Sequence, residues 1–297
     1  MQAPFCRDCF TGTLRGDVTP QGTVETLHGL PTYVSRPPDG VTPLETVVLI
    51  TDALGWELLN TRALADAYAR RVPCTVFVPD ILKGHALPLT FLTATDALDH
   101  PPNGTPPSFL TKVLTYLKLI PGLLTFLFHN HKRAAHPRVL SFFRSLRESS
   151  PPNAKIGAAG FCWGGLHTVL LTHASSPEYT YATPQGSAKP LIDCAFTAHP
   201  SLLTIPRDIE RAVQPLSVAN GDDDQFMGRQ KMEVLVRVLR GKNTDGQEER
   251  YEAVVYPGAK HGFAVRGDIG DPLQRERGEG SEEQAVRWFR RWFTSSS

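Results

Sequence analysis

The sequence has almost no net charge, few cysteines and no uninterrupted apolar run of membrane-spanning length. Among its 297 residues, 31 Lys and Arg stand against 30 Asp and Glu. The basic residues are scattered along the chain instead of forming the stripe with which proteins follow nucleic-acid phosphates. The composition therefore argues against nucleic acid as a partner.

The first ten residues lack both the basic start and the apolar stretch of a secretory signal, so we expect a cytoplasmic protein. Its five cysteines are an odd number spread over a long chain, which favours free thiols over a disulfide framework. Cys6 and Cys9 form one Cys-x-x-Cys, but no second pair follows at zinc-site spacing. We expect an N-terminal turn there, and neither a metal nor another cofactor.

Strand and helix patterns alternate along most of the chain. Polar and apolar residues alternate over residues 23–36, which predicts a hairpin at the edge of a sheet. Short apolar runs at residues 46–51, 74–79 and 155–160 predict buried strands. Helical spacing over residues 57–71 places a helix between the first two, and strand, helix, strand is typical of a parallel sheet.

The same alternation continues to the end of the chain, and no internal repeat is present. With 41% hydrophobic residues, the chain can fill one large core. We therefore predict one domain over residues 1–297, a doubly wound, mostly parallel α/β sandwich of about seven or eight strands. The later elements are expected as helices over residues 163–173, 226–240 and 282–293 and strands over residues 191–198, 216–220 and 250–256.

Residues 83–132 do not fit this alternation. They contain two Pro-Pro pairs and an apolar tract over residues 113–128 that Lys118 and Pro121 interrupt. A spanning helix needs about 18 to 20 apolar residues in succession, so we expect no stable membrane span. We predict a lid insertion, a loop with two short helices that covers a cleft. The alternatives are a buried helical hairpin and peripheral membrane attachment through residues 119–128.

Residues 160–165, Gly-Phe-Cys-Trp-Gly-Gly, have the pattern of a nucleophile elbow between a predicted strand and a predicted helix. The flanking glycines fit a strained turn in which a β-carbon would collide with its neighbours. Cys162 would lie at a helix N-terminus, where the dipole favours a thiolate and the Trp163 N–H can face a developing oxyanion. The alternative is a turn kept for packing, with the cysteine as a small buried hydrophobe.

Candidate partners for the cysteine follow two later strands. An α/β-hydrolase fold places its acid after a late strand and its histidine after the last one. Here Asp222, Asp223 and Asp224 follow one late strand, and His261 follows the last. His261 would hold or take the thiol proton, and an aspartate would orient its ring. The usual Gly-x-x-Asp spacing favours Asp224 over Asp223.

The loop at residues 51–56, Thr-Asp-Ala-Leu-Gly-Trp, follows the first predicted central strand. In this architecture such a loop supplies the second oxyanion donor, and the Ala53 N–H is the candidate. Asp52 would point a carboxylate into the same opening. It would either tune the proton on the thiol or cap the helix that begins near Trp56.

Together these motifs resemble the dienelactone hydrolase family (carboxymethylenebutenolidase-like proteins), especially its fungal branch. The resemblance covers residues 23–293. It implies a single-domain α/β-hydrolase fold, no cofactor, and hydrolysis of enol-lactones and related activated esters by a Cys-His-Asp triad, here Cys162, His261 and Asp224. The segments that carry it are residues 51–56, 160–165, 198–201, 221–224 and 261–267, in the family's order.

The resemblance also implies roles around the triad. Asp52 would pair with the resting thiol until substrate binds. His199, in a His-Pro-Ser segment, would face the pocket, with a hydrogen-bonded strand-end histidine as the alternative. Bacterial members bind the substrate carboxylate with an arginine where this chain has Val265, and Arg266 follows one place later. The residues predicted to form the pocket or tune the thiol are Asp52, Leu54, Trp56, Phe161, His199, Phe263 and Arg266.

The shifted arginine and the apolar insertion favour a larger, more hydrophobic ester or lactone as the small-molecule substrate. A second hypothesis keeps the pocket but makes the protein a lyase, isomerase or cyclase of polyketide-type secondary metabolism. A third is a catalytically silent carrier of an apolar ligand, against which the complete triad argues. The sequence is compatible with a monomer or a homodimer.

Overall fold

The computed structural model describes residues 19–38, 43, 45–99, 105–183, 186–243, 249–266 and 271–295, so Cys6 and Cys9 lie outside the described residues. Eight strands form one sheet in the order β1-β2-β4-β3-β5-β8-β9-β10. The strands from β4 to β10 run parallel, and the β1-β2 hairpin adds an antiparallel edge. The strands are β1 Thr23–Leu27, β2 Leu30–Ser35, β3 Thr46–Ile50, β4 Thr75–Pro79, β5 Ile156–Phe161, β8 Cys194–Ala198, β9 Leu216–Asp223 and β10 Tyr251–Lys260.

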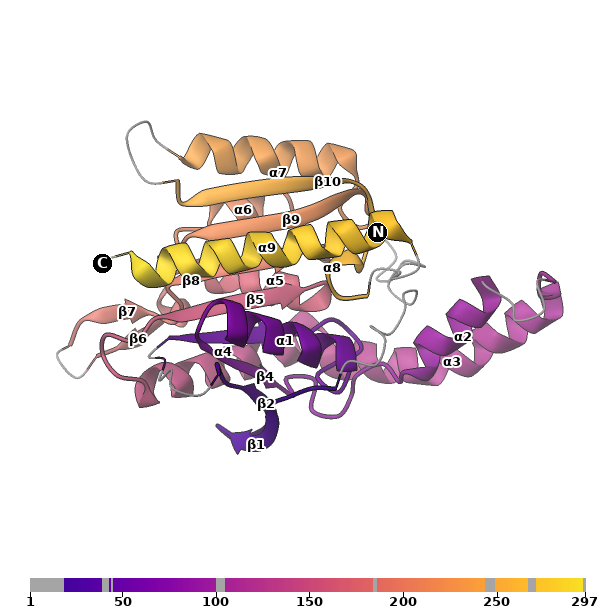
Figure 1. Cartoon of the computed structure of the whole chain (residues 1–297), viewed down its shortest axis with the longest axis horizontal. Helices are drawn as coiled ribbons and strands as arrows, with labels where there is room; N and C mark the ends of the chain where they lie inside the picture. The colour runs from indigo at the N-terminus through magenta and orange to yellow at the C-terminus, as the bar shows by residue number, and fades with distance from the viewer. Residues whose placement is uncertain are drawn as a thin grey trace.

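Helices cover both faces of this sheet, as Figure 1 shows, with α1 and α9 in front and α5 and α6 behind. The mostly parallel, doubly wound α/β fold predicted from the sequence is confirmed. A small separate sheet of β6 Thr180–Ala182 and β7 Ala188–Pro190 was not predicted. The helices are α1 Leu59–Arg71, α2 Thr90–Asp99, α3 Phe109–Asn130, α4 Lys132–Ser149, α5 Trp163–Leu171, α6 Arg207–Glu210, α7 Arg229–Lys242, α8 Phe263–Arg266 and α9 Pro272–Thr294.

The last helix begins ten residues before its predicted start, at Pro272. Asp271 caps it, because its side chain accepts from the Leu273 N–H at 2.9 Å. The early part of α9 lacks a clear apolar period. Its Gly280 is required by close packing, since a β-carbon there would lie 2.8 Å from the Tyr256 ring.

The inserted segment differs from its prediction. The expected break at Pro121 is wrong, because α3 runs through this residue. Pro121 is exposed, so the backbone carbonyl that loses its hydrogen bond can be hydrated. On the inner side, Gly122 lets the helix approach Phe91 and Pro88 closely. Figure 1 shows α2 and α3 projecting away from the sheet, with only the end of α3 returning to the body.

One described helix, α3, is long and apolar enough to cross a membrane by length and composition alone. Only 6% of its apolar window is buried in the protein. Contrary to expectation, Lys118 and Pro121 do not divide this segment into two short helices.

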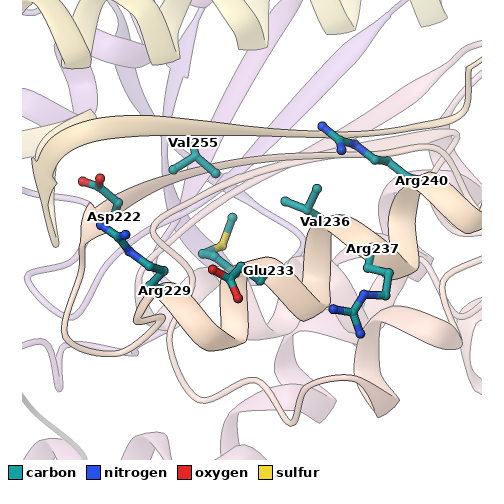
Figure 2. Close-up of a pocket in the computed structure, with 8 residues that line it drawn as sticks. Asp222, Arg229, Glu233, Val236, Arg237, Arg240 and Val255 are labelled. Atoms are coloured by element: carbon teal, nitrogen blue, oxygen red, sulfur yellow. The ribbon is translucent and has the colours of Figure 1, made fainter.

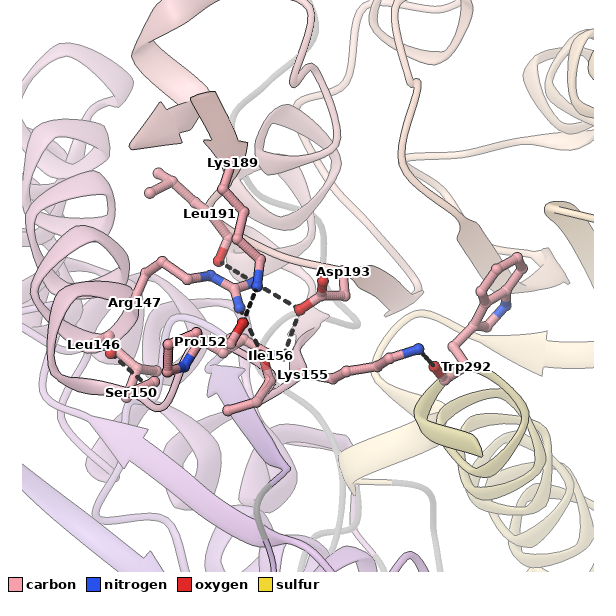
Figure 3. A network of polar contacts seen from close by, with 11 residues as sticks. Leu146, Arg147, Ser150, Pro152, Lys155, Ile156, Lys189, Leu191, Asp193 and Trp292 are labelled. Carbon is pink, nitrogen blue, oxygen red and sulfur yellow. Dashed lines mark hydrogen bonds and ion pairs between the residues drawn. The ribbon is translucent and has the colours of Figure 1, made fainter. Parts of the chain in front are cut away.

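A partly buried ionic network joins the connections at the amino ends of the parallel strands (Figure 3). Arg147 forms an ion pair with Asp193 at 2.6 Å and donates to the Ala154 carbonyl at 2.9 Å. Lys155 donates to the Trp292 carbonyl at 3.1 Å and so attaches the end of α9. Because catalytic groups lie at the carboxyl ends of such strands, this network is structural.

Candidate active site

Cys162 lies between β5 and α5 in a strained turn, with φ 51° and ψ −113°. The glycines around it are a steric requirement. A β-carbon on Gly160 would lie 2.1 Å from Oγ1 of Thr168, and one on Gly164 would lie 2.1 Å from the Ile50 carbonyl oxygen. These contacts allow β3, β5 and α5 to approach closely enough to hold the turn. The thiol thus sits at the N-terminus of α5 and is 3% exposed.

Asp224 and His261 are brought together because they follow neighbouring parallel strands, β9 and β10. Both strands are longer than predicted and end side by side. Nδ1 of His261 lies 2.9 Å from Oδ2 of Asp224, and both side chains are fully buried. The other carboxylate oxygen accepts from the Phe226 N–H at 2.8 Å and the Met227 N–H at 3.2 Å. The acid is therefore fixed in orientation by three nitrogen atoms: Nδ1 of His261 and the backbone nitrogens of Phe226 and Met227.

The neighbouring aspartates are placed differently. Asp223 is exposed, and Asp222 accepts from the Gly258 N–H at 2.6 Å. The structure thus brings Asp224, and not Asp223, to the histidine.

The charge balance of the site favours a protonated imidazole. Burial by itself lowers the pKa of His261, but the nearby charges of Cys162 and Asp224 outweigh it and raise that pKa well above its ordinary value. Since Asp224 binds Nδ1, the other ring nitrogen is left to serve the thiol. This arrangement is suited to a thiolate and imidazolium pair.

Ser201 is a neighbour of the thiol that was not among the predicted site residues. Its Oγ lies 3.9 Å from Sγ of Cys162, and its N–H donates to the Cys162 carbonyl at 3.0 Å. The signal was present in the sequence as the third residue of the His-Pro-Ser segment.

A cavity of about 170 Å³ opens beside the thiol. Ala53 and Trp163 both line it, and within the described residues neither backbone N–H donates a hydrogen bond. Two amides next to the nucleophile are thus available to a developing oxyanion. The rest of the lining comes from α3, the start of α4 and the segment after β8: Phe126, Leu127, Asn130, His131, Lys132, Ser201 and Leu202.

The residues predicted to form the pocket are not among those that line this cavity. Leu54, Phe161 and Phe263 are at most 3% exposed and belong to the core. Trp56 is half-buried and stacks on the guanidinium of Arg62 at 4.8 Å. Much of the cavity wall comes instead from the end of α3, within the insertion that the sequence predicted to cover a cleft, although the sequence pattern did not show which of its residues reach the elbow.

Asp52 and Arg266 form a buried ion pair, with Nε 2.9 Å from Oδ2 and each side chain 1% exposed. The other oxygen of Asp52 accepts from the Leu54 N–H at 2.9 Å. Burial raises the pKa of Asp52, the charge of Arg266 opposes that rise, and the charge of Cys162 adds to it. Asp52 is therefore close enough to interact with the thiol, but the ion pair in this structure is with Arg266.

His199 packs against the catalytic histidine. Its ring centroid lies 4.9 Å from that of His261, at an interplanar angle of 72°. Its backbone has φ 39°, its side chain is fully buried, and neither ring nitrogen has a hydrogen-bond partner among the described residues. Burial, reinforced by the charges of His261 and Arg266, lowers the pKa of His199 well below its ordinary value.

A second, more open groove lies between α7 and β10. Figure 2 shows Asp222 and Arg229 at one end and Arg240 at the other, with Val236 and Val255 between them. The groove contains none of the three triad candidates. Among the described residues, no group of three or more His, Cys, Asp or Glu side chains could hold a metal ion.

Known proteins resemble this chain over almost its whole length. The model of the dienelactone hydrolase family matches residues 30–293. Hydrolase pyvD of Aspergillus violaceofuscus is 24% identical over 289 residues, with 97% of each chain covered. Hydrolase tropI of Talaromyces stipitatus is 26% identical over 281 residues, with 95% of this chain and 94% of the relative covered.

Solved structures show the same fold. A dienelactone hydrolase from Anabaena variabilis superposes with a TM-score of 0.55 at 13% identity, over 92% of this chain and 99% of the other. Esterase 2 of Thermogutta terrifontis gives a TM-score of 0.57 at 14% identity, over 96% of this chain and 100% of the other.

Proposed function

This chain belongs to the dienelactone hydrolase family, and on that premise we propose that it cleaves an ester or lactone through Cys162, His261 and Asp224. The observation that carries the proposal is the fully buried Asp224 and His261 pair, 2.9 Å apart, beside a cysteine in a strained elbow. In the triad arrangement, the base must itself be oriented by a third group, and Asp224 does this.

In the first half of the reaction, the thiolate of Cys162 attacks the substrate carbonyl carbon. The carbonyl electrons move to the oxygen, which accepts hydrogen bonds from the Ala53 and Trp163 amides. When the tetrahedral intermediate collapses, the C–O bond breaks and the His261 imidazolium donates its proton to the leaving oxygen. The products are an alcohol, or the opened end of a lactone, and a thioester on Cys162.

In the second half, the now neutral His261 takes a proton from water as the water oxygen attacks the thioester. The same two amides hold the oxyanion, and the C–S bond then breaks. The carboxylic acid leaves, and the site returns to thiolate and imidazolium. Asp224 keeps Nδ1 occupied throughout, so that the other ring nitrogen remains directed to the reacting groups.

The substrate is proposed to be a comparatively apolar ester or lactone, of polyketide type. Phe126, Leu127 and Leu202 give the cavity an apolar wall. Arg266, which could have bound a substrate carboxylate, is held by Asp52. The protein is proposed to act in the cytoplasm, where the buried free thiols Cys74, Cys162 and Cys194 would remain reduced.

Kinetics of two variants test the proposal. We expect both Cys162→Ala and His261→Ala to abolish hydrolysis of a short-chain p-nitrophenyl ester. A lyase, isomerase or cyclase that uses the same pocket without a thioester remains the alternative. Turnover that survives Cys162→Ala but is lost in His261→Ala would favour that alternative and contradict the proposed mechanism.

A further inference from the structure

The outer face of α3 is an apolar stripe that nothing in the described protein covers. Large apolar side chains recur along it at alternating spacings of four and three residues, with Pro121 in the series, and so share one side of the helix. Such a large exposed patch marks an interaction surface in soluble proteins. The stripe consists of Leu110, Leu114, Leu117, Leu124 and Phe128, which are 65%, 49%, 53%, 59% and 74% exposed.

The opposite face of α3 is fixed to the protein. Leu119 and Phe126 are buried there, and Phe126 makes an edge contact with Trp163. At the end of the helix, the Asn130 carbonyl accepts from the Trp163 indole N–H at 3.0 Å. The helix could not cross a bilayer without losing these contacts. Its outer face can nevertheless meet a surface while its inner face remains packed.

The charged residues of α3 and of the first turn of α4 all have one sign. Residues 105–133 contain Lys112, Lys118, Lys132 and Arg133 and no Asp or Glu. None of these four cations forms an ion pair among the described residues. A second copy of the chain on this face would set cations near cations. An anionic lipid surface would instead accept the apolar side chains and attract the lysines.

We propose that the outer face of α3 docks on the surface of an anionic lipid bilayer, with the helix lying in the headgroup region. The cytoplasmic leaflet carries such lipids. The proposal has a consequence for access to the site, because Phe126 and Leu127 of the same helix line the cavity beside Cys162. Docking would hold the mouth of that cavity near the phase in which apolar esters dissolve. Membrane binding does not require catalysis, so it can be tested separately from the proposed function.

The test is flotation of the full-length protein with phosphatidylcholine vesicles that contain or lack phosphatidylserine. We expect binding to the phosphatidylserine vesicles that weakens as salt is raised. The double variant Leu117→Glu and Leu124→Glu should lower the bound fraction at least about tenfold, because each glutamate must leave water or displace the helix. Leu273→Glu, at a 41% exposed leucine on α9, is the matched control and should bind like the wild type.

A second variant guards against misfolding of the first. Lys112→Glu with Lys118→Glu leaves the apolar stripe intact and should also reduce binding to phosphatidylserine vesicles. The proposal would be overturned if the wild type binds neither type of vesicle. It would also be overturned if Leu273→Glu lowers the bound fraction as much as the double variant of α3 does. The proposal would also be overturned if the wild type binds no vesicles and is a dimer in light scattering that the double variant Leu117→Glu and Leu124→Glu dissociates. That result would assign the outer face of α3 to contact with a second copy of the chain.

Discussion

The Nε atom of Arg266 lies 2.9 Å from Oδ2 of Asp52, and this ion pair is almost completely buried. It links the loop after β3 to α8, the short helix that follows His261. The pair holds Arg266, which follows His261 closely in the sequence, against a protein carboxylate. Asp52 also lies close enough to the thiol for the charge of Cys162 to add to the rise in the pKa of Asp52.

Removal of this carboxylate should destabilise the fold. Asp52→Asn would leave the buried guanidinium of Arg266 without a counter-charge, which costs about 3–5 kcal/mol. The double variant with Arg266→Met should recover part of that loss, since it removes the unpaired charge. Urea unfolding of the three proteins measures this. If Asp52→Asn unfolds at the same urea concentration as the wild type, the ion pair does not contribute to the free energy of unfolding.

Asp224 should set the alkaline limit of activity. Burial lowers the pKa of His261, while Cys162 and Asp224 raise it, and the net shift is upward. Asp224→Asn removes one of the two raising charges, so the pKa of His261 must fall. The alkaline limb of the kcat/KM profile should therefore move to lower pH, with a lower maximum. An unchanged alkaline limb would mean that Asp224 does not act on His261 electrostatically.

Leu127 should select for apolar acyl groups, because it lines the cavity from the end of α3. Leu127→Asp should reduce kcat/KM for a hexanoate ester relative to an acetate ester by about tenfold or more. Leu127→Ala is the matched control for side-chain size, and should shift the ratio much less. If Leu127→Asp and Leu127→Ala both leave the hexanoate-to-acetate ratio of kcat/KM unchanged, the acyl group does not bind against Leu127.

His199 should make the fold sensitive to acid. Its folded-state pKa is lowered, so the unfolded chain takes up a proton below about pH 6.5 that the folded protein does not. Stability from this residue is thus complete above pH 6.5 and is lost as the pH falls below it, by at most about 1.4 kcal/mol per pH unit. His199→Phe should flatten the fall in unfolding free energy between neutral and mildly acidic pH. An identical slope in the variant would show that His199 does not titrate in the unfolding reaction.

The elbow could be predicted from sequence because its requirements are local. Only glycine fits at residues 160 and 164, so the pattern around Cys162 carries steric information. The positions of Asp224 and His261 followed from the strand order, since residues after neighbouring parallel strands meet at one sheet edge.

The insertion at residues 83–132 was predicted to cover a cleft, but which of its residues line the cavity could not be predicted, because that depends on tertiary contacts. The end of α3 reaches the elbow through Asn130, whose side chain donates to the His85 carbonyl at 2.8 Å and whose carbonyl accepts from Trp163. No periodicity encodes such a contact. For the same reason, the partner of Asp52 became evident only when the chain brought Arg266 to it from 214 residues away.

The most direct test of the central claim is the intact mass of the protein, quenched with acid shortly after mixing with a p-nitrophenyl ester. We expect one acyl adduct per chain in the intact mass, and digestion should locate it on a peptide that contains Cys162. The adduct should be absent in Cys162→Ala and retained in Cys74→Ala and Cys194→Ala, whose thiols are buried away from the cavity. Turnover without an adduct in Cys162→Ala, or an adduct on another residue, would contradict it.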